Sequence, residues 1–239
     1  MKLKLSPSLI KFAYRFFDVE ASAETAVADG RMIEYAFVIE KLTQLPKGKV
    51  LDVGCTARLN YLPAALTSLG WEVWGIDLRE FKFKHQNFHM ALEDITGTSF
   101  PDNFFDAVYA VSTLEHIGLS GRYVVTKEDL EGDSNSVKEI ARILRPSGIL
   151  LCTVPFAGEA RIIKPLQRVY DKLGLERLFA NWTRKDEVYY AQEGGGYWVP
   201  LTDEKDVVKV QNPDGDSVVA LLELSSVKLN GFGIKSGGE

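Results

Sequence analysis

The order of apolar and polar positions along the chain predicts strands that alternate with helices. Short, nearly continuous apolar runs have the length of buried strands, and they occupy residues 49–55, 71–78, 87–95, 105–117 and 149–156. Residues 61–70 instead carry apolar positions at helical spacing and end on Gly70. Residues 134–144 do the same after Ser134, the expected N-cap, and residues 145–148, Arg-Pro-Ser-Gly, are expected to end that helix.

These strands are apolar along their whole length rather than at every second position. That pattern is typical of a mostly parallel sheet covered by helices on both faces. We therefore predict a doubly wound α/β fold. In such sheets the ligand lies beyond the carboxyl ends of the strands, near the point where the strand order reverses.

Polar side chains follow the predicted strands at that edge. Carboxylates are rarely buried unless they are paired, so core packing does not readily explain three of them at successive strand ends. Asp77 follows Gly54 by 23 positions, close to the separation at which an acidic residue reaches the ribose hydroxyls of a nucleoside. The alternative for Asp77 is a helix cap. The residues at this edge are Asp52 to Cys55, Asp77, Asp94 with Ile95, and Ser112 to His116.

Composition limits the class of protein and its partners. The chain has 239 residues, 46% of them hydrophobic, which suits one large globular domain. Its formal net charge is −5 and it has no long basic run, so nucleic acid is a poor candidate partner. Cys55 and Cys152 lie in or beside apolar strands, which indicates a reduced intracellular protein without a disulfide framework, and neither resembles a metal ligand.

The N-terminal residues 1–17 combine lysines with aromatic side chains. Ser6, Pro7, Ser8 and Lys11 interrupt the apolar run, so it is neither a signal peptide nor a spanning helix. An amphipathic helix docked on the domain is favoured over one lying on a membrane surface. We expect a cytoplasmic protein without stable membrane insertion. No pattern in the sequence indicates an oligomeric state.

Five segments, in this order, resemble the class I S-adenosylmethionine-dependent methyltransferases. They are VLDVGC (50–55), WGIDL (74–78), EDI (93–95), FDAVYAVSTLEHI (105–117) and LRPSGILLCTVPF (144–156). VVALLELSS (218–226) is similar to the family's last strand, which inserts antiparallel at the sheet's edge. The resemblance implies a seven-stranded Rossmann-like sheet, S-adenosylmethionine as the cofactor, and methyl transfer.

Three further segments are similar to a bacterial and archaeal branch of this family that often accompanies glycan and secondary-metabolite genes. They are DLREFKFKHQNFHMALEDI (77–95), STLEHIGL (112–119) and RVYDKLGLERLF (168–179). We divide the chain accordingly into a helical cap (1–48), a cofactor-binding core (49–156), an acceptor-side insert (157–215), the last strand (216–230) and a flexible tail (231–239). The insert's many aromatic residues could form a platform for a sugar or aromatic ring, or could simply pack on the sheet.

The family's first turn usually reads acid-x-Gly-x-Gly-x-Gly. Asp52 and Gly54 keep this pattern, with Cys55 in the same turn, whereas Thr56 and Arg58 stand at the second and third glycine positions. A methionine moiety has no pyrophosphate, so one close backbone approach at Gly54 is enough. Arg58 either pairs with the cofactor's carboxylate or weakens binding through its bulk.

The resemblance assigns the remaining cofactor contacts. Asp94 accepts from the adenine amino group, the Ile95 amide donates to the ring, and Leu78 lines the adenine. Glu34 and Tyr35, in the helical pattern at 31–42, are candidates for the methionine end. The alternative for this segment is an amphipathic covering helix in which Tyr35 is packed.

The catalytic candidates follow the fourth strand. His116 is the expected general base, because histidine titrates near working pH, and its alternative role is a structural hydrogen bond. Glu115 could orient His116 or serve a metal. Related metal-dependent enzymes carry Glu-x-x-Glu-His, whereas this chain has Ser112 in place of the first Glu. We therefore predict no metal site and assign Ser112 to the cofactor.

The sequence lacks the motifs of two other enzyme classes. A nicotinamide dehydrogenase needs Gly-x-Gly-x-x-Gly, which GCTARL (54–59) does not supply, and a base-directed N-methyltransferase needs Asn/Asp-Pro-Pro-aromatic where this chain has STLE. The predicted function is methyl transfer to a small-molecule acceptor, namely a hydroxyl of a sugar or glycan precursor or of a secondary metabolite. The alternative is a non-catalytic binding module on the same fold.

Overall fold

The computed structural model describes residues 30–57, 60–121, 123, 125, 127–193 and 197–226. Several predictions concern other residues: most of the N-terminal cap, the tail at 231–239, Arg58, and the glycines at 194–196 lie outside the described residues. Of the predicted cap, the structure describes helix α2 (Gly30–Thr43).

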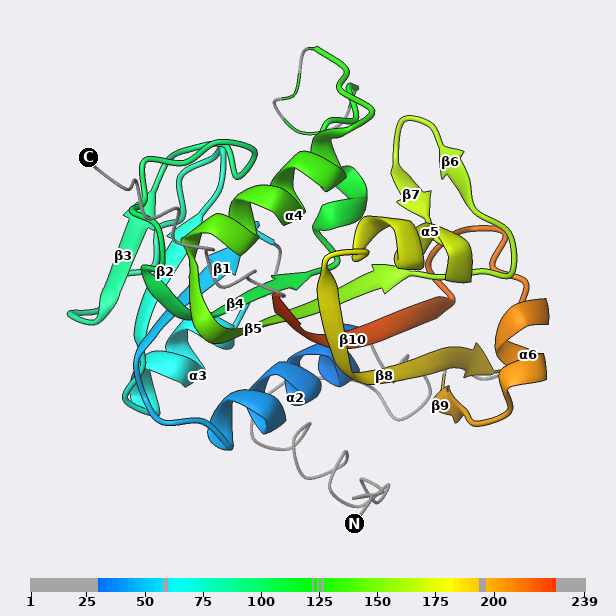
Figure 1. Ribbon diagram of the computed structural model, residues 1–239, viewed down its shortest axis with the longest axis horizontal. Coiled ribbons are helices and arrows are strands. Elements are labelled where there is room, and N and C mark those ends of the chain that lie inside the picture. Colours follow the sequence, from blue (N-terminus) through cyan, green and yellow to red (C-terminus); the bar gives the residue numbers. More distant parts are fainter. Residues whose placement is uncertain are drawn as a thin grey trace, which may run out of the picture.

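A mixed sheet forms the centre of the molecule, with the strand order β3-β2-β1-β4-β5-β10-β8-β9 (Figure 1). The first five strands in this order are parallel. β10 runs antiparallel to both of its neighbours, and β9 runs antiparallel to β8. The bounds are β1 (Lys49–Val53), β2 (Glu72–Ile76), β3 (Phe88–Ala91), β4 (Phe105–Val111), β5 (Leu144–Pro155), β8 (Trp182–Glu193), β9 (Tyr197–Leu201) and β10 (Val218–Ser226).

The predicted α/β fold and its antiparallel last strand are confirmed, with two corrections. Within the described residues the sheet has eight strands rather than seven, and β10 lies between β5 and β8 rather than at the edge. Both differences come from residues 157–215, which contribute β8 and β9 to the sheet. Their aromatic side chains concealed the strand pattern, because a packed insert and a half-buried strand are both rich in them.

Helices cover both faces of the sheet (Figure 1). Val38 and Leu42 of α2 pack with Leu66 of α3 (Leu62–Ser68) in one buried apolar cluster. Ile140 of α4 (Gly132–Ile143) and Leu175 of α5 (Lys172–Leu178) belong to a second cluster. The remaining elements are a one-turn 3₁₀ helix, η1 (Leu114–His116), a hairpin of β6 (Arg161–Ile163) and β7 (Gln167–Val169), and α6 (Glu204–Lys209).

The predicted boundaries differ from the observed ones mainly at the carboxyl ends of the strands. β4 ends at Val111, and of the residues that follow, Leu114–His116 form η1. Helix α4 begins at Gly132, so Ser134 is not its N-cap, and the Ser134 amide donates to Asp133 instead. No helix among the described residues has the length and apolar character needed to cross a membrane.

Candidate active site

A cavity of about 810 Å³ opens beyond the carboxyl ends of β1, β2 and β4. Parallel strands bring these ends to one edge of the sheet, as the doubly wound pattern predicts. Among the described residues, the structure brings together on this cavity most of the predicted cofactor residues and the predicted base. They are Gly54, Asp77, Leu78, Asp94, Ile95, Ser112 and His116.

Gly54 is needed by the turn itself. Its φ is +80°, and a Cβ at this position would lie 2.5 Å from the Thr113 hydroxyl oxygen, so another residue would be strained here. The Gly54 amide donates to the Ile76 carbonyl oxygen at 2.9 Å. Although Gly54 lines the cavity, its amide is therefore already used within the sheet.

Asp52, in β1, and Cys55, in the turn itself, do not line the cavity. Asn60 joins them, because its side-chain amide donates to Asp52 at 2.7 Å and to the Cys55 carbonyl oxygen at 3.0 Å. Burial raises the pKa of the Asp52 carboxyl from 3.8 to about 7; the hydrogen bond from Asn60 opposes the increase, and the charge of Asp77 adds to it. Burial likewise raises the pKa of the Cys55 thiol. These two residues support the turn, and Asn60 is a support that the glycine motif did not reveal.

Asp77 is held by the residue that replaces the second glycine. Its carboxylate accepts hydrogen bonds from the Thr56 hydroxyl at 2.6 Å and the Thr56 amide at 3.2 Å. The Arg79 amide and guanidinium donate to the other oxygen at 2.9 and 3.1 Å. The Asp77 side chain is only 7% exposed. Thr56, which stands where the family usually has glycine, therefore orients Asp77, the residue predicted to bind the ribose.

The residues predicted around the adenine stand together on the cavity wall. Asp94 is exposed and accepts from the Thr96 amide and hydroxyl, both at 2.9 Å, which fixes the carboxylate in an Asx turn. Ile95 is buried and Leu78 is exposed, and both line the cavity.

Glu34 is buried where α2 meets the ends of β4 and β5. Its Oε1 accepts from the Ser112 and Thr153 hydroxyls, both at 2.5 Å, and Oε2 forms an ion pair with Arg31 at 3.3 Å. Arg31 also donates to the Val111 carbonyl oxygen at 3.1 Å and lines the cavity, whereas Glu34 does not. The predicted carboxylate therefore fixes Arg31 and Ser112, and Arg31 is a site residue that the sequence reasoning missed.

Tyr35 is not part of the cavity. Its side chain is buried in the core between α2 and the sheet, and its ring meets Tyr61 edge-on at 6.3 Å. The packed alternative for Tyr35 is the one that the structure supports.

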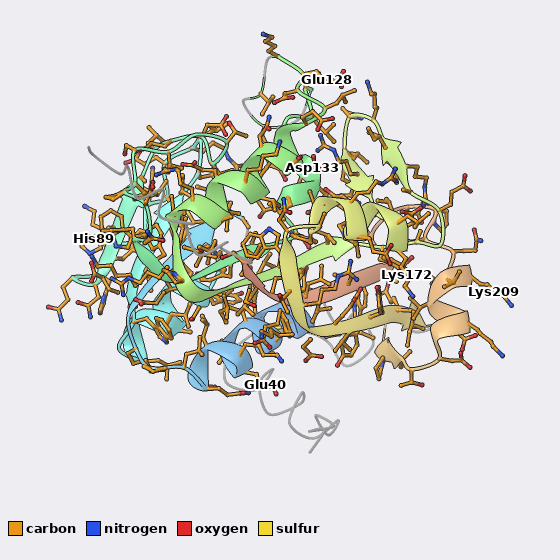
Figure 2. The ribbon with its side chains drawn as sticks, in the orientation of Figure 1. Glu40, His89, Glu128, Asp133, Lys172 and Lys209 are labelled. Atoms are coloured by element: carbon orange, nitrogen blue, oxygen red, sulfur yellow. The ribbon has the colours of Figure 1, made fainter. Side chains whose placement is uncertain are left out.

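A second cavity, of about 340 Å³, adjoins the first. Arg31, Ser112 and His116 line both cavities. Glu34 and Glu115, which do not reach the first cavity, line the second. His116 therefore stands on the boundary between two adjacent spaces. The other two histidines line neither cavity, and His89 on β3 packs on the Trp74 ring at 4.5 Å (Figure 2).

The tautomer of His116 follows from its hydrogen bond to the β6–β7 turn. Nδ1 lies 2.7 Å from the Leu166 carbonyl oxygen. A carbonyl oxygen can only accept, so Nδ1 carries the proton and Nε2 is the basic nitrogen of the neutral ring. Oε1 of Glu115, a residue only 1% exposed, lies 3.7 Å from Nε2. A buried carboxylate is thus placed to stabilise the protonated ring.

Arg168, on β7, anchors the backbone on both sides of His116. Its buried guanidinium donates to the carbonyl oxygens of Ile117 at 2.7 Å and Glu115 at 3.4 Å, and to Leu130 at 3.0 Å. The guanidinium also pairs at 3.4 Å with Asp133, near the start of α4 (Figure 2). Described residues between Ile117 and Leu130 form part of the first cavity's wall. Arg168 therefore binds the backbone at both ends of this stretch. Sequence reasoning missed this role.

Tyr123, between Ile117 and Leu130 in the chain, contacts both Arg79 and His116. Its ring is 4.6 Å from the Arg79 guanidinium and 5.4 Å from the His116 ring. Arg79, which contacts Asp77, and His116, the predicted base, therefore share Tyr123 as an aromatic neighbour. Among the described residues, no three His, Cys, Asp or Glu side chains gather closely enough to hold a metal ion.

Comparison with known proteins identifies the domain that carries this site. Residues 51–152 match the family described as methyltransferase domain. No curated protein has a detectably similar sequence.

Many solved structures share the fold. The chain is similar to 1,6-didemethyltoxoflavin-N1-methyltransferase of Burkholderia thailandensis, with a TM-score of 0.58 at 15% identity over 92% of this chain and 86% of that one. It is also similar to the N-methyltransferase NodS of Bradyrhizobium japonicum, with a TM-score of 0.56 at 14% identity over 87% and 94% of the two chains. A third is PH0226 of Pyrococcus horikoshii, with a TM-score of 0.54 at 19% identity over 90% and 98%.

The first two of these structures contain S-adenosylhomocysteine. At such low identity the likeness shows the fold alone, and the methyltransferase match is to residues 51–152. Residues 51–152 therefore form a methyltransferase domain, set in the fold that the solved methyltransferases share.

Proposed function

We propose that this methyltransferase transfers a methyl group to a hydroxyl of a small molecule, with His116 as the general base. The observation that carries the proposal is the bond from His116 Nδ1 to the Leu166 carbonyl oxygen, because it leaves Nε2 as the basic nitrogen on the boundary of two cavities. A sugar or glycan precursor, or a secondary metabolite, is the expected acceptor class.

The residues of the larger cavity fit S-adenosylmethionine. Asp77 would accept from the ribose hydroxyls, Asp94 and the Ile95 amide would bind the adenine, and Arg31 would face the carboxylate of the methionine end. About 810 Å³ is ample for a nucleoside joined to an amino acid. When bound, the cofactor supplies an electrophilic methyl group on a positively charged sulfur.

His116 and Glu115 would manage the acceptor's proton. Nε2 would take the proton from the acceptor hydroxyl as the hydroxyl oxygen bonds to the methyl carbon and the bond between that carbon and the cofactor's sulfur breaks. The resulting imidazolium would keep its Nδ1 bond to Leu166 and gain the attraction of the Glu115 carboxylate, 3.7 Å from Nε2. Burial of Glu115 strengthens this attraction, because the local dielectric is lower than that of water.

The structural neighbours support a small-molecule acceptor. One is an N1-methyltransferase solved with 1,6-didemethyltoxoflavin bound, and another is an N-methyltransferase. At 15% and 14% identity their acceptor atoms do not carry over to this chain. The preference for oxygen rests on His116, since a hydroxyl needs a base more than a neutral amine does.

Calorimetric titration of the purified protein with S-adenosylmethionine and, separately, with NADH tests the cofactor assignments. Micromolar binding of the first ligand alone, lost in Asp77→Ala, is expected. Transfer of labelled methyl groups to a panel of sugars, phenols and amines then tests the acceptor. Cofactor binding without transfer to any hydroxyl would contradict the proposal, and absence of cofactor binding would favour the binding-module alternative.

A further inference from the structure

We propose that the second cavity is the acceptor site and that it selects a hydroxylated ring compound without negative charge, with an amino-substituted ring preferred. This inference rests on the proposed function and adds the place and charge of the acceptor. It depends on three features of the cavity: its shared wall with the cofactor cavity, the charges of its lining residues, and Trp198.

The shared wall places an acceptor next to the reacting group. Arg31, Ser112 and His116 line both cavities, and the base therefore faces each of them. A volume of about 340 Å³ lies at the small end of the range for small-molecule sites. A monosaccharide-sized molecule fits this space, whereas a polymer would have to lie mostly outside it.

The charges of the lining residues disfavour an anion. Glu34, Glu115 and Asp216 supply three carboxylates, and Arg31 is the one lining Lys or Arg among the described residues. Arg31 is already paired with Glu34. The Arg31–Glu34 pair carries no net charge, so the excess negative charge comes from Glu115, which is buried and little screened by water, and from Asp216, which is exposed. A carboxylate or phosphate on the acceptor would be repelled, and an ammonium group would be attracted.

Trp198 supplies an aromatic face. It lies on β9 and lines the cavity, with its ring beside Gly30 at the start of α2. The close approach depends on Gly30, since a Cβ there would lie 2.8 Å from the Trp198 ring. The faces of Trp rings attract cations and also pack against the apolar face of a saturated ring. This side chain comes from residues 157–215, the segment predicted to contact the acceptor.

Three pyranoses that differ in charge provide the test. Protein saturated with S-adenosylhomocysteine is titrated calorimetrically with D-glucosamine, D-glucose and D-glucuronate. We expect D-glucosamine to bind most tightly and D-glucuronate to bind at least about tenfold more weakly than D-glucosamine. Equal affinities, a preference for D-glucuronate, or no binding of any of the three would overturn the inference.

A pair of variants tests whether the preference arises in this cavity. Asp216→Asn removes one charge at the cavity but keeps an oxygen that can accept from Gln167, which donates to Asp216 at 3.1 Å. It should reduce the preference for D-glucosamine several-fold. Asp214→Asn is the matched control, because Asp214 is exposed on the same turn and lines neither cavity. Equal effects of the two variants would show a general charge effect and reject the site.

Trp198→Ala should weaken all three sugars while leaving S-adenosylhomocysteine binding unchanged, because Trp198 does not line the larger cavity. The titration with S-adenosylhomocysteine also separates the two proposals. Failure to bind S-adenosylhomocysteine would reject the proposed function, whereas normal binding without charge discrimination among the sugars would reject this inference alone.

Discussion

The Nδ1 atom of His116 lies 2.7 Å from the carbonyl oxygen of Leu166, 50 positions further along the chain. The turn between β6 and β7 thereby determines which imidazole nitrogen carries the proton. If Nε2 is the base, replacing His116 by Asn should keep a donor near Leu166 but remove the basic atom. We expect the turnover rate to fall about 10²- to 10⁴-fold, with the affinity for S-adenosylhomocysteine unchanged.

The pH profile of this variant provides its control. The wild-type rate should rise with pH as His116 loses its proton, and the residual rate of His116→Asn should lack that step. A variant that retained the wild-type rate and profile would assign His116 the structural role instead.

Thr56 should contribute to cofactor binding through Asp77. Thr56→Ala removes the 2.6 Å hydrogen bond from the hydroxyl to the carboxylate. Asp77 keeps its bonds to the Thr56 amide and to Arg79 but loses part of its orientation, so the Kd of S-adenosylmethionine should rise several-fold, measured by calorimetry. Thr56→Ser keeps the hydroxyl and is the matched control. Thr56→Gly, which restores the family's usual residue, should also bind more weakly than the wild type if Thr56 orients Asp77.

Asp52 should make the protein's stability depend on pH near neutrality. Because burial raises the pKa of Asp52 from 3.8 to about 7 in the folded protein, the folded state binds more protons than the unfolded state between these values. The free energy of unfolding therefore falls as pH rises through this window. Asn cannot ionise, so the Tm of Asp52→Asn minus the Tm of the wild type should increase as the pH is raised from 5 to 8.

Glu139 provides an internal contrast to Asp52. Hydrogen bonding to Arg142 lowers the pKa of Glu139 from 4.5 to about 2, so its contribution to stability is lost only as pH falls through that lower range. A Tm difference between Asp52→Asn and the wild type that stayed constant from pH 5 to pH 8 would show that Asp52 does not titrate there.

Arg168 should act on catalysis through the position of His116. Arg168→Lys keeps the charge near Asp133 but loses the forked donors that reach several carbonyl oxygens. We expect a lower turnover rate, a shifted pH profile and a lower Tm. Arg168→Met leaves Asp133 buried without its ion pair and should cost about 3–5 kcal/mol of folding free energy.

The control for Arg168 is Lys164→Ala on the same hairpin. Lys164 is exposed and pairs with Glu128 at 3.0 Å, and such surface pairs contribute about 0–1 kcal/mol. If Arg168→Lys lowered the Tm but left the pH profile unchanged, Arg168 would be a structural residue only.

The outline of the fold and half of the site could be predicted from the linear pattern. Near-continuous apolar runs separated by helical segments require a covered parallel sheet, and such a sheet brings the residues after each strand to one edge. That is why Asp77, Asp94 and His116, far apart in sequence, were expected together and line one cavity. The matched domain, which supports the family prediction, covers the same residues.

The sequence by itself determined the parallel sheet and the residues at the carboxyl ends of its strands, because these follow from local periodicity and from the geometry of parallel strands. Only the tertiary structure decided that Tyr35 is packed in the core, that Thr56 orients Asp77, and that Leu166 and Arg168 hold His116. These contacts depend on side-chain direction and on the position of a distant hairpin. No local pattern encodes either, because both result from packing the whole chain.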